Sequence, residues 1–139
     1  MMMHRNKTTL LFLFPVLWLC VATSSAIHIT PKVYVEVSNQ LPQSHYFVIL
    51  YKSNEDKLGA NVAPKQVYGF HFRPNIWGTT HFTCEVRTDY GTGTYKIYEY
   101  DRDHKRCGNQ CLWKVTQSGV ESANGNVPII FYWTTTPGS

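Results

Sequence analysis

The sequence of 139 residues lacks most features that mark an enzyme or a nucleic-acid-binding protein. It contains no G-x-S-x-G nucleophile motif and no glycine-rich phosphate loop. Charged residues make up only 16% of the chain, and they form no basic stripe of the kind that binds nucleic acid. No N-x-S/T glycosylation sequon follows Ala26. We therefore expect no enzymatic activity, no cofactor, no nucleic-acid partner and no N-linked sugar.

Helical periodicity is also missing after the first 26 residues. No ten-residue window there repeats apolar side chains every 3.6 residues, whereas β-branched and aromatic residues are abundant. Turn-forming residues separate the segments that are rich in them. We expect about seven strands, at 32–38, 45–52, 67–73, 79–88, 94–100, 111–117 and 127–135. Their number and spacing predict a single all-β domain, either a sandwich or a barrel.

Alternation within these segments indicates the core. Val33, Val35 and Val37 share one face of an extended chain, as do Phe70 and Phe72. We expect Trp113 to be buried beside Cys111. The continuous apolar run 129–133 fits a strand buried on both faces or an exposed edge strand, and we favour the buried strand. Residues 134–139 are expected to form a frayed polar tail.

The N-terminus has the pattern of a secretory signal peptide. Basic residues precede an apolar run from Leu10 to Val21, and small residues at 24–26 form a cleavage site. The run is shorter than the roughly 20 apolar residues that span a bilayer, and it contains Pro15. We expect cleavage between Ala26 and Ile27, secretion of residues 27–139 as one domain, and no membrane insertion of the mature chain. Removing residues 1–26 leaves 11 basic and 9 acidic residues, a mild net charge of +2.

Three cysteines remain after cleavage, namely Cys84, Cys107 and Cys111. In an oxidising compartment one pair forms a disulfide and one cysteine is left over. Cys107 and Cys111 lie about 13 Å apart if extended, so a bridge between them requires a turn, which Gly108 can supply. A bridge from Cys84 to either partner instead closes a longer loop. The sequence leaves the pairing open, and the unpaired thiol is a possible route to a dimer.

The run from Tyr68 to Cys84 reads YGFHFRPNIWGTTHFTC. It resembles the plant self-incompatibility protein family, the S-protein homologues, whose members carry an F-x-F-x-P-N-x-W/F-G-T-T-x-F-x-C core. The resemblance implies an antiparallel β-sandwich and a secreted signalling or recognition ligand that binds a cell-surface protein. It extends over most of residues 33–119, with further matches at 35–41, 52–59, 95–98, 107, 111–115 and 119.

One departure from the family pattern concerns the first half-cystine. The family usually has His-Cys before its K-S-x-D-D turn, whereas this chain has Leu50-Tyr51. The resemblance therefore implies that a bridge usual in the family is missing here.

Two charged loops are candidates for recognition, because binding residues concentrate on loops that a rigid scaffold positions. The first, Lys52–Lys57, also matches the family's turn, so a structural role can explain it. The second is the better candidate and contains residues of both charge signs, Asp101, Arg102, Asp103, His104, Lys105 and Arg106.

Three other functions would each require a particular arrangement of side chains. A hydrolase or nuclease would need paired, mutually close groups among His45, His71, His81 and His104. His104 with Cys107 and Cys111 fits no established zinc spacing, so we predict no metal site. A polysaccharide-binding module would need a coplanar exposed row of rings, for which the candidates are Trp77, Tyr90, Tyr98 and Tyr100.

Overall fold

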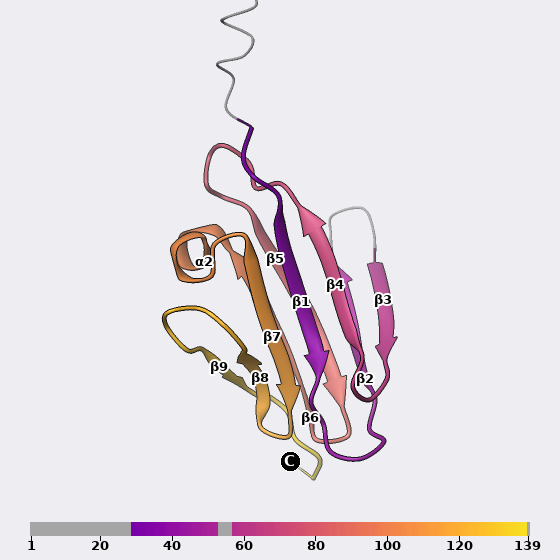
Figure 1. Cartoon of the computed structure of the whole chain (residues 1–139). Coiled ribbons are helices and arrows are strands. Elements are labelled where there is room, and N and C mark those ends of the chain that lie inside the picture. Colours follow the sequence, from indigo (N-terminus) through magenta and orange to yellow (C-terminus); the bar gives the residue numbers. More distant parts are fainter. Residues whose placement is uncertain (1–28, 53–56, 139) are drawn as a thin grey trace, which may run out of the picture.

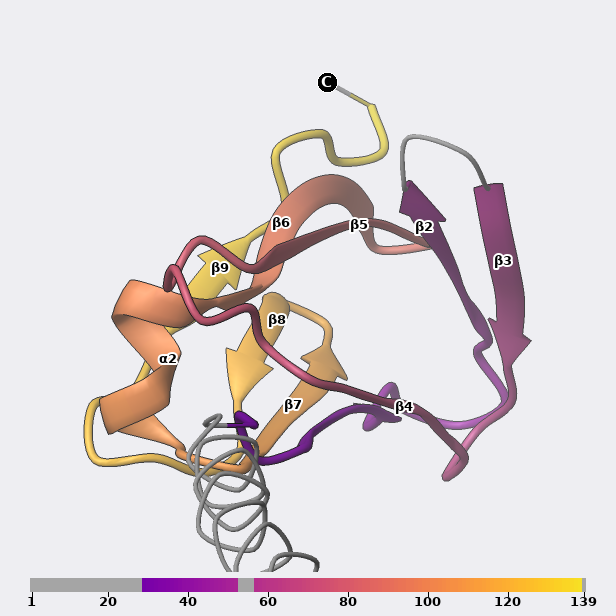
Figure 2. The ribbon, with the colours of Figure 1, turned by 90° about the horizontal axis from the view of Figure 1, so that it is seen from above.

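Two β-sheets pack face to face in the computed structural model, which describes residues 29–52 and 57–138 (Figure 1, Figure 2). The first sheet contains, in order across it, β4 (Val67–Phe72), β1 (Val33–Asn39), β7 (Gln110–Thr116), β8 (Gly119–Ser122) and β9 (Ile130–Tyr132). The second contains β3 (Lys57–Val62), β2 (Phe47–Lys52), β5 (His81–Thr88) and β6 (Gly91–Glu99). β1 and β7 are parallel, and the other neighbours are antiparallel. The predicted all-β sandwich is confirmed.

The described residues form nine strands, two more than the sequence predicted. β3 was missed because Val62 is the only strong strand former in KLGANV and the ladder with β2 supplies its order. β8 was missed because its four residues, GVES, include only one β-branched side chain. The segment predicted as a strand over 127–135 is shorter, and only Ile130–Tyr132 forms ladder pairs.

The core follows the alternation that the sequence predicted. Along β1 the side chains alternate between buried and half-buried, with Val33, Val35 and Val37 facing the second sheet. Trp113 on β7 and Phe47 on β2 are among the largest fully buried side chains, which confirms the prediction for Trp113. Their removal from water is the main source of stability.

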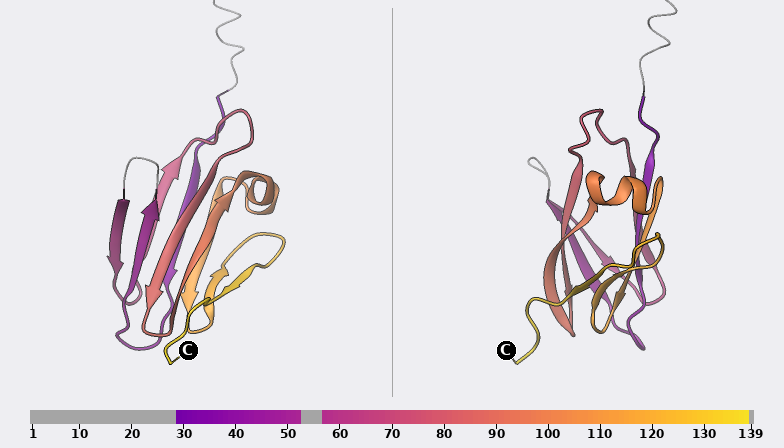
Figure 3. Two further views of the ribbon diagram at one scale, coloured as in Figure 1. Left: turned by 180° about the vertical axis from the view of Figure 1, so that it is seen from behind. Right: turned by 90° about the vertical axis from the view of Figure 1, so that its left-hand side faces the viewer.

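The apolar run 129–133 is not the buried strand that we favoured. Ile130 and Tyr132 are exposed and only the residues between and beside them are half-buried, as expected of an edge strand. The tail is also ordered at its start, because Thr135 pairs with Thr92 of the opposite sheet, with N–H···O distances of 2.8 and 3.1 Å. The C-terminal segment thereby crosses from one layer to the other (Figure 3).

The segment that was predicted as a charged recognition loop is a helix, α2 (Tyr100–Arg106). Seven residues are too few to show a helical period in a ten-residue window, so the apolar pattern did not predict this helix. The charges explain its stability: Asp101 and Asp103 lie in the first turn and three basic residues lie in the last turn. This arrangement complements the helix dipole.

The predicted signal peptide and its cleavage site lie outside the described residues, as do residues 53–56 of the first charged loop. In the described part of the chain, no helix is long and apolar enough to cross a membrane.

Candidate functional site

Helix α2 is not fully exposed, because a buried charged group anchors it to the sandwich. Asp103 is fully buried, and its carboxylate accepts hydrogen bonds from Arg102 Nη2 at 2.7 Å and Arg106 Nε at 2.8 Å. The backbone N–H of Glu99 donates a further bond at 2.9 Å. Burial alone would raise the pKa of Asp103, but these bonds outweigh it and hold the pKa below 3.8. Asp103 is therefore an anion with its bonding capacity filled.

The two guanidinium groups also join α2 to the first sheet. Their central carbons lie 5.4 Å (Arg102) and 5.0 Å (Arg106) from the centre of a Trp113 ring, within cation–π range. Arg106 donates to Asn124 O at 3.0 Å, and Arg102 donates to Lys96 O at 2.8 Å. These contacts commit Asp103 and Arg106 to holding the helix in place. Because both side chains are buried, a partner cannot reach them directly, and the exposed members of the predicted set remain the candidates for contact.

The other predicted recognition residues are accessible to different degrees. Asp101 and Lys105 are exposed, whereas Arg102 and His104 are half-buried. His104 stacks on Tyr100 with ring centres 4.4 Å apart. A partner can therefore reach Asp101 and Lys105, and only the edges of the other two side chains.

The structure decides between the cysteine pairings that the sequence left open. Cys107 and Cys111 form the disulfide, with Cα atoms 5.1 Å apart. The turn comes from Gly108, whose φ of 66° favours glycine. The bridge ties the end of α2 to β7.

Cys84 is the remaining free thiol. It is 1% exposed, and burial raises its pKa to about 12. The predicted dimer through an unpaired cysteine gains no support, because this sulfur cannot reach another molecule while the sandwich is closed. Its cross-strand neighbour on β2 is Tyr51, the residue that replaces the family's usual half-cystine.

A second candidate surface is the loop between β4 and β5, at the tip of the sandwich. Asn75 organises this loop, because its Oδ1 accepts from the backbone N–H groups of Trp77 and Thr79, each at 3.1 Å. Its own N–H donates to Thr80 Oγ1 at 2.8 Å. The ordered loop leaves Ile76 68% and Trp77 79% exposed. Large apolar side chains held outward in this way are typical of an interaction surface.

The tip loop lies against α2. Gly78 has a φ of 70°, and a Cβ built there would lie 3.0 Å from the Tyr100 ring. The N–H of Tyr100 donates to Thr80 O at 3.0 Å. We call Ile76 and Trp77, with Asp101 and Lys105, the tip surface. No pattern in the sequence predicted that these side chains are held outward, and the only local indication of an ordered turn is Asn75, because asparagine side chains bond to the backbone two residues on.

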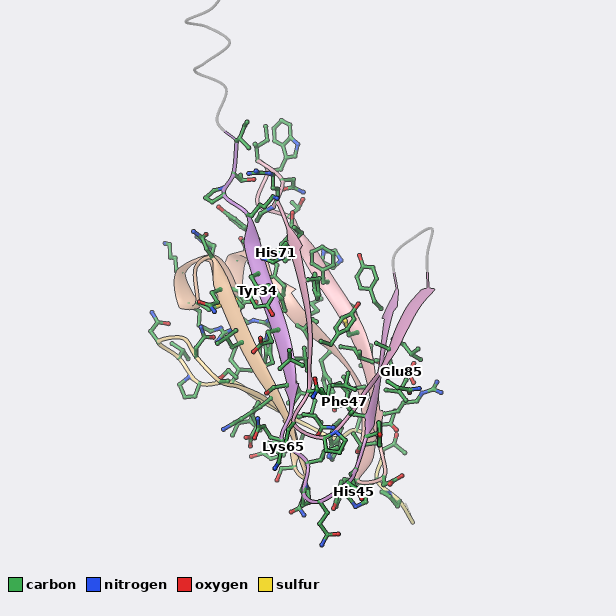
Figure 4. The ribbon with its side chains drawn as sticks, turned by 45° about the vertical axis from the view of Figure 1, so that its right-hand side comes forward. Tyr34, His45, Phe47, Lys65, His71 and Glu85 are labelled. Carbon is green, nitrogen blue, oxygen red and sulfur yellow. A yellow bond between two sulfur atoms is a disulfide. The ribbon has the colours of Figure 1, made fainter. Side chains whose placement is uncertain are left out.

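Catalysis, metal binding and carbohydrate binding find little support in the described residues. His45 lies with Tyr90 and Asp89, whereas His71 packs at a tilt against Tyr34 at the other end of the sandwich, so these two do not form a catalytic pair (Figure 4). No group of three possible metal ligands occurs in residues 29–52 and 57–138. Tyr98 is fully buried, which removes it from any carbohydrate-binding row.

Comparison with known proteins identifies the family. The model described as plant self-incompatibility protein S1 matches residues 34–133, almost the whole sandwich. The chain belongs to this family. The inferred resemblance is therefore confirmed.

Individual relatives in this family are moderately similar. S-protein homolog 5 of Arabidopsis thaliana is 39% identical over 69 residues, which are 49% of this chain and 53% of the relative. Self-incompatibility protein S1 of Papaver rhoeas is 30% identical over 93 residues, 65% of this chain and 67% of the relative. The chain thus spans about half to two thirds of these relatives. Neither name denotes an enzymatic activity.

Proposed function

We propose that this family member is an extracellular recognition ligand that binds a cell-surface protein through the tip surface. The observation that carries the proposal is the β4–β5 loop, in which Asn75 fixes the backbone while Ile76 and Trp77 remain exposed. A fixed aromatic anchor loses little conformational entropy on binding, which is why tryptophan is enriched at interface hot spots.

The charged residues of α2 complement this anchor. Asp101 and Lys105 are exposed on a helix that the Asp103 network holds rigid, and Asp101 lines a shallow pocket with Gly78 and Thr79 of the loop. Charges at the rim of an interface set association rate and partner choice more than they set affinity. Within the 101–106 segment, we therefore assign the recognition role to the two exposed residues, Asp101 and Lys105.

The test uses labelled protein and plasma-membrane vesicles from plant tissue. Trp77→Ala should weaken saturable binding by at least tenfold, and Asp101→Asn with Lys105→Gln should mainly reduce its salt dependence. Tyr46→Ala is the matched control, because Tyr46 is exposed but precedes β2 at the other end of the sandwich. Protease treatment of the vesicles should abolish binding. Equal binding by Trp77→Ala and the unmodified protein would contradict the proposal.

We further propose that residues 1–26 direct secretion and are then removed. The basic start, the short apolar run and the small residues before Ile27 support this. N-terminal sequencing of protein recovered from the medium of expressing plant cells should begin at Ile27. Secreted material that begins at Met1 would contradict it.

A further inference from the structure

A cavity of about 170 Å³ lies between the sheets at the edge away from α2. Its position follows from the topology, because β3 and β4 are the outermost strands of their sheets on this side. Aromatic rings from both sheets dominate its lining, and the lining residues are Tyr51, Tyr68, Phe70, His71, Phe72 and Phe82.

The rings around this cavity are tilted rather than stacked. Tyr51 and Phe82 have ring centres 5.5 Å apart at 38°, and Phe70 and Phe82 are 5.3 Å apart at 66°. Each of these residues is half-buried, unlike the fully buried core beside them. An apolar cavity of roughly 150 Å³ accepts benzene. The space therefore matches one six-membered ring with a small substituent.

The polar groups near the cavity are neutral. Burial raises the pKa of Tyr51 and of Tyr68, and the nearby Cys84 thiol reinforces both shifts. Neither hydroxyl has a hydrogen-bond partner within the described residues. The His71 ring lies on the outer face against Tyr34, at 4.7 Å, and so brings no charge inside (Figure 4). A charged ligand would find no counter-ion in this lining, whereas a neutral hydroxyl can pair with a tyrosine.

We propose that this cavity binds a small single-ring phenol, with its ring among Phe70, Phe72 and Phe82 and its hydroxyl paired with Tyr51 or Tyr68. The inference is independent of the tip surface. Binding is non-covalent, because the ligand is held by ring contacts and one hydrogen bond. Such a ligand would bridge the two sheets at the edge where they lack a helix.

The probe is p-cresol, titrated into the oxidised secreted protein and followed by amide NMR shifts and calorimetry. With about eight non-hydrogen atoms and a single hydrogen bond, it should bind with a Kd of roughly 0.1–1 mM. The shifted amides should belong to β2, β4 and β5. Toluene, which has the same ring and methyl group but no hydroxyl, should bind several-fold more weakly.

Two variants make the test specific. Phe82→Trp fills the cavity and should weaken p-cresol binding at least tenfold. Tyr51→Phe with Tyr68→Phe keeps both rings and should reduce the affinity for p-cresol to that for toluene. Tyr132→Phe is the matched control, because Tyr132 lies on the opposite edge of its sheet, and it should bind p-cresol like the unmodified protein.

The proposal fails if p-cresol causes no saturable shift below 10 mM (about tenfold above the expected Kd range), or if the shifted amides lie elsewhere. Equal affinity for p-cresol in the double tyrosine variant and the unmodified protein would also overturn it. The Phe82→Trp result is used only if the amide spectrum of that variant shows a folded sandwich. If the variant does not fold, the binding result for the double tyrosine variant decides whether the proposal holds.

Discussion

The two edges of the sandwich are closed by opposite chemistry. At the α2 edge, Arg102, Asp103 and Arg106 form a charged network over Trp113, and the Cys107–Cys111 disulfide follows directly. At the β3–β4 edge, half-buried aromatic rings surround a cavity beside the free thiol of Cys84. One edge is closed by directional bonds and a covalent link, and the other only by ring contacts.

This difference predicts different responses to change. A buried ionic network fails when one member is lost, because the remaining charges cannot be solvated. Aromatic packing has no such requirement and accepts substitutions of similar volume at small cost. The α2 edge is therefore suited to hold the tip surface rigid, and the β3–β4 edge is suited to adapt to a ligand.

The largest expected effect comes from breaking the charged network. Asp103→Ala leaves the guanidinium groups of Arg102 and Arg106 without a counter-ion and should lower the free energy of unfolding by about 3–5 kcal/mol. Urea denaturation at pH 7 measures this change. Asp101→Ala is the matched control on the same helix, and because Asp101 is exposed its effect should stay within about 0.5 kcal/mol. Similar losses in both variants would show that the network is not the anchor.

Removing the disulfide should have the next largest effect. Cys107→Ser with Cys111→Ser frees a very short loop, for which chain entropy predicts a loss of about 2 kcal/mol. A reducing agent should lower the melting temperature of the unmodified protein and leave that of the double variant unchanged. A reductant effect that persists in the double variant would point to another bridge.

A smaller net effect is expected when a bridge is added at the aromatic edge. Tyr51 and Cys84 are direct cross-strand partners, and such partners have Cα separations that permit a disulfide. Tyr51→Cys should therefore abolish the single free thiol, while loss of the Tyr51 ring offsets most of the gained stability. Thiol titration in denaturant should find no free group. Leu50→Cys is the control, because its partner is Glu85 and it should leave two free thiols.

The smallest effect is a change in the slope of stability against pH. The pKa of Asp103 is lowered in the folded protein, so its contribution is present above the unfolded value near 3.8 and is lost as pH falls towards the folded pKa. One such group changes the slope by at most about 1.4 kcal/mol per pH unit. Below pH 4, the free energy of unfolding of the Asp103→Asn variant should therefore fall less steeply with falling pH than that of the unmodified protein. An unchanged slope would contradict the lowered pKa.

Regular alternation made much of the fold predictable. β1 and β4 show their inward residues directly, since a half-buried strand needs an apolar side chain at every second position. β3 and β8 could not be predicted in this way, because they contain few β-branched or aromatic residues and gain their order from the hairpin ladders with β2 and β7. The helix was missed because seven residues are too few to show a helical period, and the contacts of Arg106 with Trp113 and Asn124 that fix it lie outside the segment.

The candidate site was predicted only in outline. The density of charged residues predicted 101–106 as a recognition segment. Which of its side chains are exposed depends on which of them face Trp113. The tip loop was identified only as a loop, although Trp77 was noted as an exposed ring. Its ordering depends on Asn75 bonds that span four and five residues, and its position depends on the contact of Gly78 with Tyr100.

The sequence by itself determined the all-β class, the family and the inward residues of the longer strands, because each depends on local spacing. Only the tertiary structure decided that Cys107 pairs with Cys111, that Cys84 faces Tyr51, and that Asp103 is buried. The first depends on the backbone turn at Gly108, and the other two depend on which segments, separate in the sequence, lie side by side. Such distances are set when the two sheets pack, since packing selects which side chains lose contact with water.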